Sequence, residues 1–221
     1  MTLLLTANWT AFGAGSGSSP AGGGAGSRYE TPASPEETAR LAYNAGVRGV
    51  EKGDELSADA ARQTDVKKQQ KVLGKAKSAY TGALKKFTRA IELNPVMYEA
   101  WNYLGYTHRK LGDYQAALSA YDRALNLKPG FPEAIEYRGH AYLGLNRLED
   151  AKEAYLTLFA GNRKLAAQLL AGMQAWVGEH RGNPAGVDGA SLEAFASWVS
   201  ERNAIAGQTA GLTREGSGAG W

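Results

Sequence analysis

The feature that most constrains this chain of 221 residues is an internal repeat. The phrase at 87–95, Phe-Thr-Arg-Ala-Ile-Glu-Leu-Asn-Pro, returns at 121–129 as Tyr-Asp-Arg-Ala-Leu-Asn-Leu-Lys-Pro, an offset of 34 residues. Each phrase ends at a proline, which cannot continue a helix. A repeat of this length is typical of stacked helical hairpins, in which each unit buries its apolar face against the next one.

The residues between the two prolines predict two short amphipathic helices. The first apolar stripe has helical spacing and consists of Trp101, Leu104, Gly105, His108 and Leu111. Gly112 and Asp113 then end one helix and cap the next. The second stripe consists of Tyr114, Ala117, Leu118, Tyr121 and Leu125. Two such helices pack as a hairpin, with Gly105 and Ala117 small where the backbones come closest.

This unit resembles the tetratricopeptide repeat, whose pattern W-x2-L-G-x2-Y, then A-x3-F, then P fits residues 98–131. The matching residues, which we expect to form the repeat core, are Trp101, Leu104, Gly105, Ala117, Tyr121, Ala124 and Pro129. The next unit, 132–165, keeps Gly139, Ala151 and Tyr155 of this core, but Arg163 replaces its final proline. The resemblance implies an all-α, right-handed superhelix of about three helical hairpins.

The first unit, at about 39–97, departs from the pattern. Its second helix is clear from Ala83, Phe87 and Ala90, but its first helix fits only if it lies near 41–54, where Gly53-Asp54 echoes the turn of the middle unit. Residues 55–78 are then an insertion, rich in Ala, Lys and Gln and free of proline. We expect this insertion to be helical and to extend the second helix beyond the repeat body.

Two further amphipathic helices are expected within 166–206. The first carries a stripe of Leu169, Leu170, Met173, Trp176 and Val177, and should cover the exposed end of the stack. The second follows Ser191 and carries Leu192, Phe195, Trp198 and Val199. This second helix is interpreted either as a further cover or as a partner-binding helix.

The ends of the chain differ from its helical middle. Residues 1–34 are a mildly apolar leader followed by a linker of Gly, Ser, Ala and Pro, and 207–221 are predicted to be a flexible tail. The leader is interpreted either as a truncated signal peptide of an exported, periplasmic protein or as the disordered start of a cytoplasmic one. The composition, which is rich in Ala and Gly, suggests a bacterial source. No apolar run approaches the about 20 residues of a membrane-spanning helix.

The sequence does not indicate an enzyme. Cysteine is absent, which excludes thiolate nucleophiles and Cys-ligated zinc. The histidines His108, His140 and His180 are isolated from one another, and no nucleotide-binding or protease motif is present. We therefore expect no catalytic residue, no metal site, no cofactor and no small-molecule substrate.

The strongest charge feature is the segment 67–89, which contains eight Lys or Arg residues and no acid. The favoured interpretation is a solvated face of a long helix, and the alternative is a surface for nucleic acid or an anionic membrane. The upstream acids Glu51, Asp54, Glu55, Asp59 and Asp65 could also pair with these lysines across the hairpin. The net charge of +3 is too small to require a nucleic-acid partner.

The resemblance implies a scaffold that binds another protein or peptide, because the first helices of successive tetratricopeptide repeats line a concave surface. Carried over position by position, the partner-binding residues are Tyr43, Asn44, Asn102, Tyr103, Tyr106, Arg109, Glu136, Tyr137 and His140. Tyrosine offers rigid area with a hydroxyl group, while Asn and Arg can hydrogen-bond to a peptide. The alternatives are ordinary packing of each tyrosine and, for the whole chain, a self-assembling scaffold. The sequence does not fix the oligomeric state.

Overall fold

The computed structural model describes residues 33–182 and 186–216, so the predicted leader and linker at 1–34 lie almost wholly outside the described residues. The described part is all-α, which confirms the predicted fold class, and it contains no strand. Its helices are α1 (Pro35–Arg62), α2 (Val66–Leu93), α3 (Tyr98–Lys110), α4 (Tyr114–Leu127), α5 (Pro132–Gly144), α6 (Leu148–Gly161), α7 (Arg163–Gly182) and α8 (Gly189–Gly216). No helix in this part is both long enough and apolar enough to span a bilayer.

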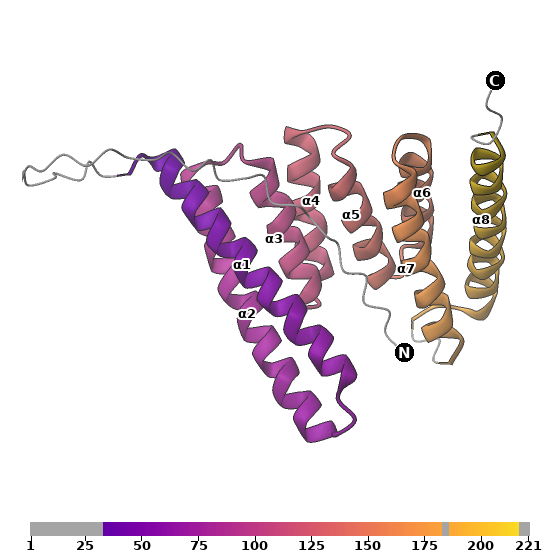
Figure 1. Ribbon diagram of the computed structural model, residues 1–221, viewed down its shortest axis with the longest axis horizontal. Coiled ribbons are helices and arrows are strands. Elements are labelled where there is room, and N and C mark those ends of the chain that lie inside the picture. The colour runs from indigo at the N-terminus through magenta and orange to yellow at the C-terminus, as the bar shows by residue number, and fades with distance from the viewer. Residues whose placement is uncertain (1–32, 183–185, 217–221) are drawn as a thin grey trace, which may run out of the picture.

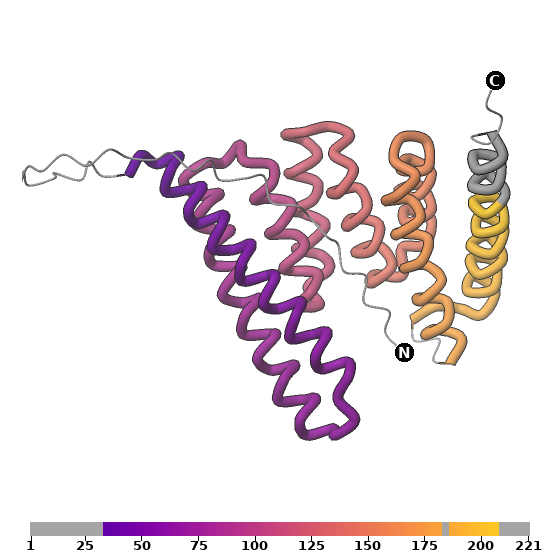
Figure 2. Tube along the Cα trace, viewed as in Figure 1, coloured from indigo at the N-terminus to yellow at the C-terminus, as the bar shows by residue number. Residues whose placement is uncertain are grey.

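Consecutive helices pack as neighbours and build an elongated stack (Figure 1). The hairpins α1–α2, α3–α4 and α5–α6 lie in chain order, with α2 against α3 and α4 against α5. The trace in Figure 2 shows the same order, with α1 and α2 at one end of the stack and α8 at the other. Each hairpin therefore buries its faces against the units before and after it, as the repeat length predicts.

Local signals set the helix ends. Ser34 caps α1 by accepting a hydrogen bond from the Glu37 N–H (3.1 Å), with Pro35 at the first helical position. Gly112 takes a positive φ of 84° in the α3–α4 turn, and Asn146 takes the equivalent conformation (φ 57°) before α6. Asparagine tolerates the left-handed region better than most residues, so the third unit turns without a glycine at this position.

Small residues set the closest approach within each hairpin. A Cβ atom added to Gly105 would lie 2.6 Å from Cε1 of Tyr121, and one added to Gly46 would lie 2.6 Å from Cε1 of Phe87. At Gly139 the neighbour is instead Leu169 of α7, also at 2.6 Å. The aromatic ring of the second helix therefore lies on the glycine of the first helix in the first two hairpins, and α7 takes that place in the third.

The other predicted core residues differ in how deeply they are buried. The fully buried ones are Ala117, Ala124, Ala151 and Tyr155. Trp101 and Leu104 are half-buried, and they pack against a small cluster formed by Ala90, Ile91 and Ala100. Pro129 is exposed, because it lies in the turn after α4 and contributes a helix stop rather than packing.

The insertion differs from its prediction. Residues 55–62 continue α1, residues 66–78 belong to α2, and Asp65 caps α2 by accepting from the Lys68 N–H (3.0 Å), so the insertion lengthens both helices rather than the second alone. Gly53 is not a turn residue. It is buried in the middle of α1, where a Cβ atom would lie 2.4 Å from Cε1 of Tyr80. The far halves of α1 and α2 form an arm that projects past the other hairpins (Figure 1).

The C-terminal helices share one core with the third hairpin. The buried residues of α8 that join it are Leu192, Phe195, Ala196 and Val199. Trp198 meets Tyr155 of α6 edge-on (5.5 Å between ring centroids), and Phe195 meets Trp176 of α7 (5.4 Å). The apolar face of α8 is therefore buried against α6 and α7. The helix continues to Gly216, past the expected start of the tail, and residues 217–221 lie outside the described part.

Candidate partner-binding surface

The four predicted partner-binding tyrosines form a continuous row across the first helices of the three hairpins. Tyr43 of α1 contacts Tyr103 of α3 (5.7 Å between ring centroids), Tyr103 is 6.4 Å from Tyr106, and Tyr106 is 5.1 Å from Tyr137 of α5. We call this row the tyrosine wall. Its members come from units that are far apart in sequence, and the stacking of the hairpins brings them together.

The tyrosine wall is also part of the packed interior. Tyr103 stacks on the buried Phe87 (5.4 Å), and Tyr137 lies 6.2 Å from the buried Tyr121. Burial raises the pKa values of Tyr43, Tyr106 and Tyr137 above the ordinary tyrosine range, because the charged phenolate loses its hydration. Each of these rings therefore has a packing role, whatever else it binds.

Arg109 lies between two rings of the wall. Its guanidinium carbon is 5.0 Å from the ring centroid of Tyr106 and 5.6 Å from that of Tyr137, which is within cation–π range. Asn44, by contrast, is exposed on α1. The wall therefore combines aromatic area with a fixed cation.

Asn102 and Glu136 occupy equivalent positions, 34 residues apart, and both are buried, with 4% and 5% of their surface exposed. Glu136 has a partner on its own helix, because its Oε1 lies 2.8 Å from Nε2 of His140. His140 is in turn covered by α7, packing directly against Gly172. Asn102 differs, since its Oδ1 atom is buried and has no hydrogen-bond partner. This acceptor on the helix of Tyr103 and Tyr106 is therefore both buried and unpaired.

Asp54 is a polar residue of this region whose position the sequence did not reveal. Its carboxylate accepts hydrogen bonds from the hydroxyl groups of Tyr80 (2.6 Å) and Tyr106 (2.8 Å), and it pairs with Lys110 (2.9 Å). These groups come from three helices, and 52 positions separate Asp54 from Tyr106. The sequence predicts a turn at Asp54, because nothing local indicates that α3 packs here.

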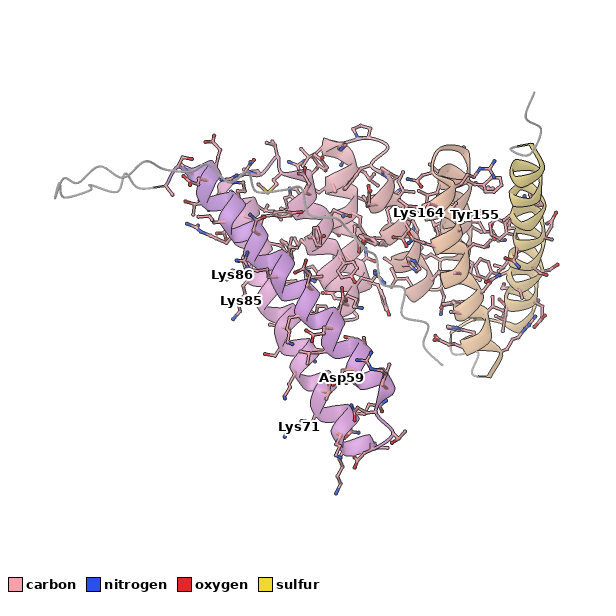
Figure 3. The ribbon with its side chains drawn as sticks, in the orientation of Figure 1. Asp59, Lys71, Lys85, Lys86, Tyr155 and Lys164 are labelled. Atoms are coloured by element: carbon pink, nitrogen blue, oxygen red, sulfur yellow. The ribbon has the colours of Figure 1, made fainter. Side chains whose placement is uncertain are left out.

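The basic segment 67–89 lies on the outer side of the α1–α2 hairpin. Figure 3 shows Lys71, Lys85 and Lys86 pointing away from helices α3 to α8. The expected pairing with the upstream acids is not formed in the part of the chain that the structure describes. Glu55 pairs with Lys52 (2.8 Å) and Asp59 with Arg62 (3.7 Å), both within α1.

Comparison with known families decides the assignment. Two models of the tetratricopeptide repeat match the chain, one at residues 76–132 and the other at 108–173. Residues 76–173 of the chain are therefore tetratricopeptide repeats. The chain belongs with scaffolds for protein–protein interaction, and the tetratricopeptide-repeat fold is generally a non-enzymatic module.

Several solved tetratricopeptide-repeat structures are similar to this chain. The second such domain of human RPAP3, solved in complex with an HSP70 peptide, is 19% identical; the match covers 57% of this chain and 95% of that one, with a TM-score of 0.39. The first such domain of Spaghetti (RPAP3), bound to an HSP90 peptide, is 19% identical over 60% and 96%, with a TM-score of 0.42. The Arabidopsis OM64 domain is 20% identical over 58% and 93%, with a TM-score of 0.40. No curated protein matches the chain.

Proposed function

We propose that this protein binds an extended polypeptide segment along the tyrosine wall and catalyses no reaction. The observation that carries the proposal is the unpaired Oδ1 atom of Asn102, a buried side chain on α3 next to the tyrosines. Buried polar atoms in folded proteins nearly always have a hydrogen-bond partner, so a buried acceptor without one calls for an explanation. A peptide N–H group would satisfy it once the side chains that cover it move aside, since the atom has almost no exposed surface in the free protein.

The surroundings of Asn102 suit a peptide rather than a small polar ligand. The tyrosines supply flat area that loses little conformational entropy on binding, and Arg109 supplies a cation already held between two rings. An extended chain offers one N–H donor for every residue, and its side chains would lie on the rings. Recognition would therefore combine one buried hydrogen bond with aromatic contacts on both sides.

The third unit provides an internal comparison. Glu136 stands where Asn102 stands in the second unit, but His140 satisfies it and α7 covers His140. The unpaired acceptor therefore lies in the second unit, between the α1–α2 hairpin and α5. We expect the centre of the bound peptide to lie there rather than at the α7 end of the stack.

The test uses peptides selected on the wild-type protein from a random displayed library. Truncating Tyr103 or Tyr137 is a poor probe, because their packing against Phe87 and Tyr121 would be lost together with any partner contact. Asn102→Leu removes the acceptor and puts an apolar side chain of similar shape in its place. Asn126→Leu, at an exposed position on α4, is the matched control. The proposal requires that Asn102→Leu weakens peptide binding and that Asn126→Leu does not; equal binding by all three proteins would refute it.

A further inference from the structure

One face of α2 carries a row of cations that neither the fold nor the tyrosine wall uses. Seven exposed residues form it, and we call them the basic row: Lys67, Lys68, Lys71, Lys75, Lys85, Lys86 and Arg89. At 100° per residue these positions fall within an arc of about 100°, and the row is about 33 Å long. The remaining cation of the segment, Lys77, lies outside this arc.

The basic row has almost no internal neutralisation. Within 33–182 and 186–216 none of its lysines forms an ion pair, and Arg89 pairs with Glu92, the only acid of α2 (3.2 Å). The opposite side of α2 is buried against α1 and α3 through Ala76, Tyr80, Ala83 and Phe87. The helix is therefore held firmly by its apolar face while its charges point outward, as Figure 3 shows for Lys71, Lys85 and Lys86.

We propose that the basic row docks this protein on a bilayer surface that carries anionic headgroups. A row of cations along one unbroken helix can touch a flat surface over its whole length, whereas a cylindrical duplex would meet only part of it. No aromatic side chain lies in the row, so it offers no platform for stacking the bases of single-stranded nucleic acid. The charges of the basic row therefore complement a flat anionic bilayer surface along the whole length of the row.

The composition of the row also fixes the mode of attachment. Ser78 and Gly82 lie between its lysines, and between Lys67 and Arg89 no apolar side chain projects from the same arc. Interfacial helices that insert into the acyl region need an apolar face, and the apolar face of α2 around Tyr80 and Phe87 is already buried in the stack. The exposed Val66 and Leu73 lie outside the arc of the basic row. Attachment is therefore peripheral and electrostatic. The tyrosine wall belongs to α1, α3 and α5, so docking through α2 does not use its residues.

The first test measures sedimentation with vesicles of phosphatidylcholine, with and without phosphatidylserine. Binding should require phosphatidylserine and fall steeply as salt is added. Replacing Lys67, Lys68, Lys71 and Lys75 together by Gln should weaken binding by about a hundredfold or more. The matched control removes four exposed cations outside the row, at Arg40, Arg48, Arg123 and Lys164. It should weaken binding far less, and circular dichroism should show unchanged helicity in both variants.

The second test uses the absence of cysteine from the chain to place a single fluorophore. Ser78→Cys puts it in the middle of the basic row, and Ser200→Cys puts it at an exposed position on α8, at the other end of the stack (Figure 1). Lipids with a nitroxide on the headgroup should quench the first label and not the second. Equal quenching of both labels would contradict docking through α2.

Besides equal quenching of the two labels, three outcomes would overturn the proposal. They are no binding to phosphatidylserine vesicles, an equal loss of binding in the row variant and the matched control, and displacement from the vesicles by random-sequence duplex DNA at lower concentration than by free phosphatidylserine vesicles. The last outcome would assign the basic row to nucleic acid. Vesicle binding should be unchanged by Asn102→Leu, so failure here and failure of the peptide-binding proposal are separate results.

Discussion

Replacing Asn102 by Leu should make the free protein more stable and the complex weaker. The side chain is 4% exposed and its Oδ1 atom has no hydrogen-bond partner, so the native fold retains the cost of desolvating one amide oxygen. That cost is about 1–3 kcal/mol for a buried unsatisfied group. Leucine has nearly the same branched shape and removes the polar atom. We therefore expect a stability gain of about 1–2 kcal/mol.

Thermal unfolding followed by circular dichroism measures the first half of this prediction. For a chain of this size, 1 kcal/mol shifts the Tm by about 2–4 °C, so Asn102→Leu should melt a few degrees above the wild type. Asn126→Leu, on the surface of α4, should melt within about a degree of it. A variant that loses stability by more than about 1 kcal/mol would show that the Asn102 amide makes a favourable interaction in the free protein, and the reasoning would fail.

Titration of a selected peptide measures the second half. Removing the acceptor leaves a peptide N–H group without a partner in the complex, which costs about 1–3 kcal/mol. The dissociation constant should therefore rise by about fivefold to 150-fold. Opposite signs for the two measurements are the essential result, because an ordinary structural defect would lower both stability and affinity. An unchanged dissociation constant would refute the role given to Asn102.

Three further predictions concern the fold that holds the wall. Gly105→Ala should lower the free energy of unfolding, measured in urea, by about 1–3 kcal/mol, because its Cβ atom would lie 2.6 Å from the ring of the buried Tyr121. An unchanged free energy of unfolding would mean that the hairpin is loosely packed. Asp54→Ala should lower the free energy of unfolding by a similar amount, because it removes a hydrogen-bond acceptor from the hydroxyl groups of Tyr80 and Tyr106. Glu55→Ala, at an exposed ion pair, should change it by less than about 0.5 kcal/mol. Burial raises the pKa of Tyr106 in the folded protein. Its contribution to the free energy of unfolding is therefore complete below the ordinary pKa of 10.0 and is lost as the pH rises further, so the urea midpoint of unfolding should fall above that pH. Tyrosinate absorbance of the folded protein developing fully at the ordinary pKa would contradict this.

The middle hairpin could be predicted from sequence because its signals are local and agree with one another. Gly105, the Gly112 turn and Tyr121 repeat a spacing that only paired helices explain, and the structure places Tyr121 on Gly105. The insertion could not be read in the same way. Gly53-Asp54 looks like the turn at Gly112-Asp113, but Tyr80 covers Gly53 and the helix continues to Arg62. A glycine can serve either a turn or a close approach, and the choice depends on the packed neighbour.

The candidate site likewise has features that the sequence predicts and features that only tertiary packing decides. Repeat position alone places the tyrosines on the first helices, and their row across α1, α3 and α5 follows from stacking. Position cannot distinguish Asn102 from Glu136, which are equivalent in sequence. The difference arises because His140 lies within hydrogen-bond distance of Glu136, whereas Asn102 has no such neighbour. The three-helix contacts of Asp54 are also decided by tertiary packing.

The most direct test of the central claim is a map of where a selected peptide lies on the protein. Backbone amide chemical shifts of the isotopically labelled chain, recorded with and without the peptide, give this map residue by residue. Binding along the tyrosine wall predicts the largest changes in α1, α3 and α5, centred on Asn102. Changes confined to α2, α4 and α6, with none around Asn102, would contradict the claim.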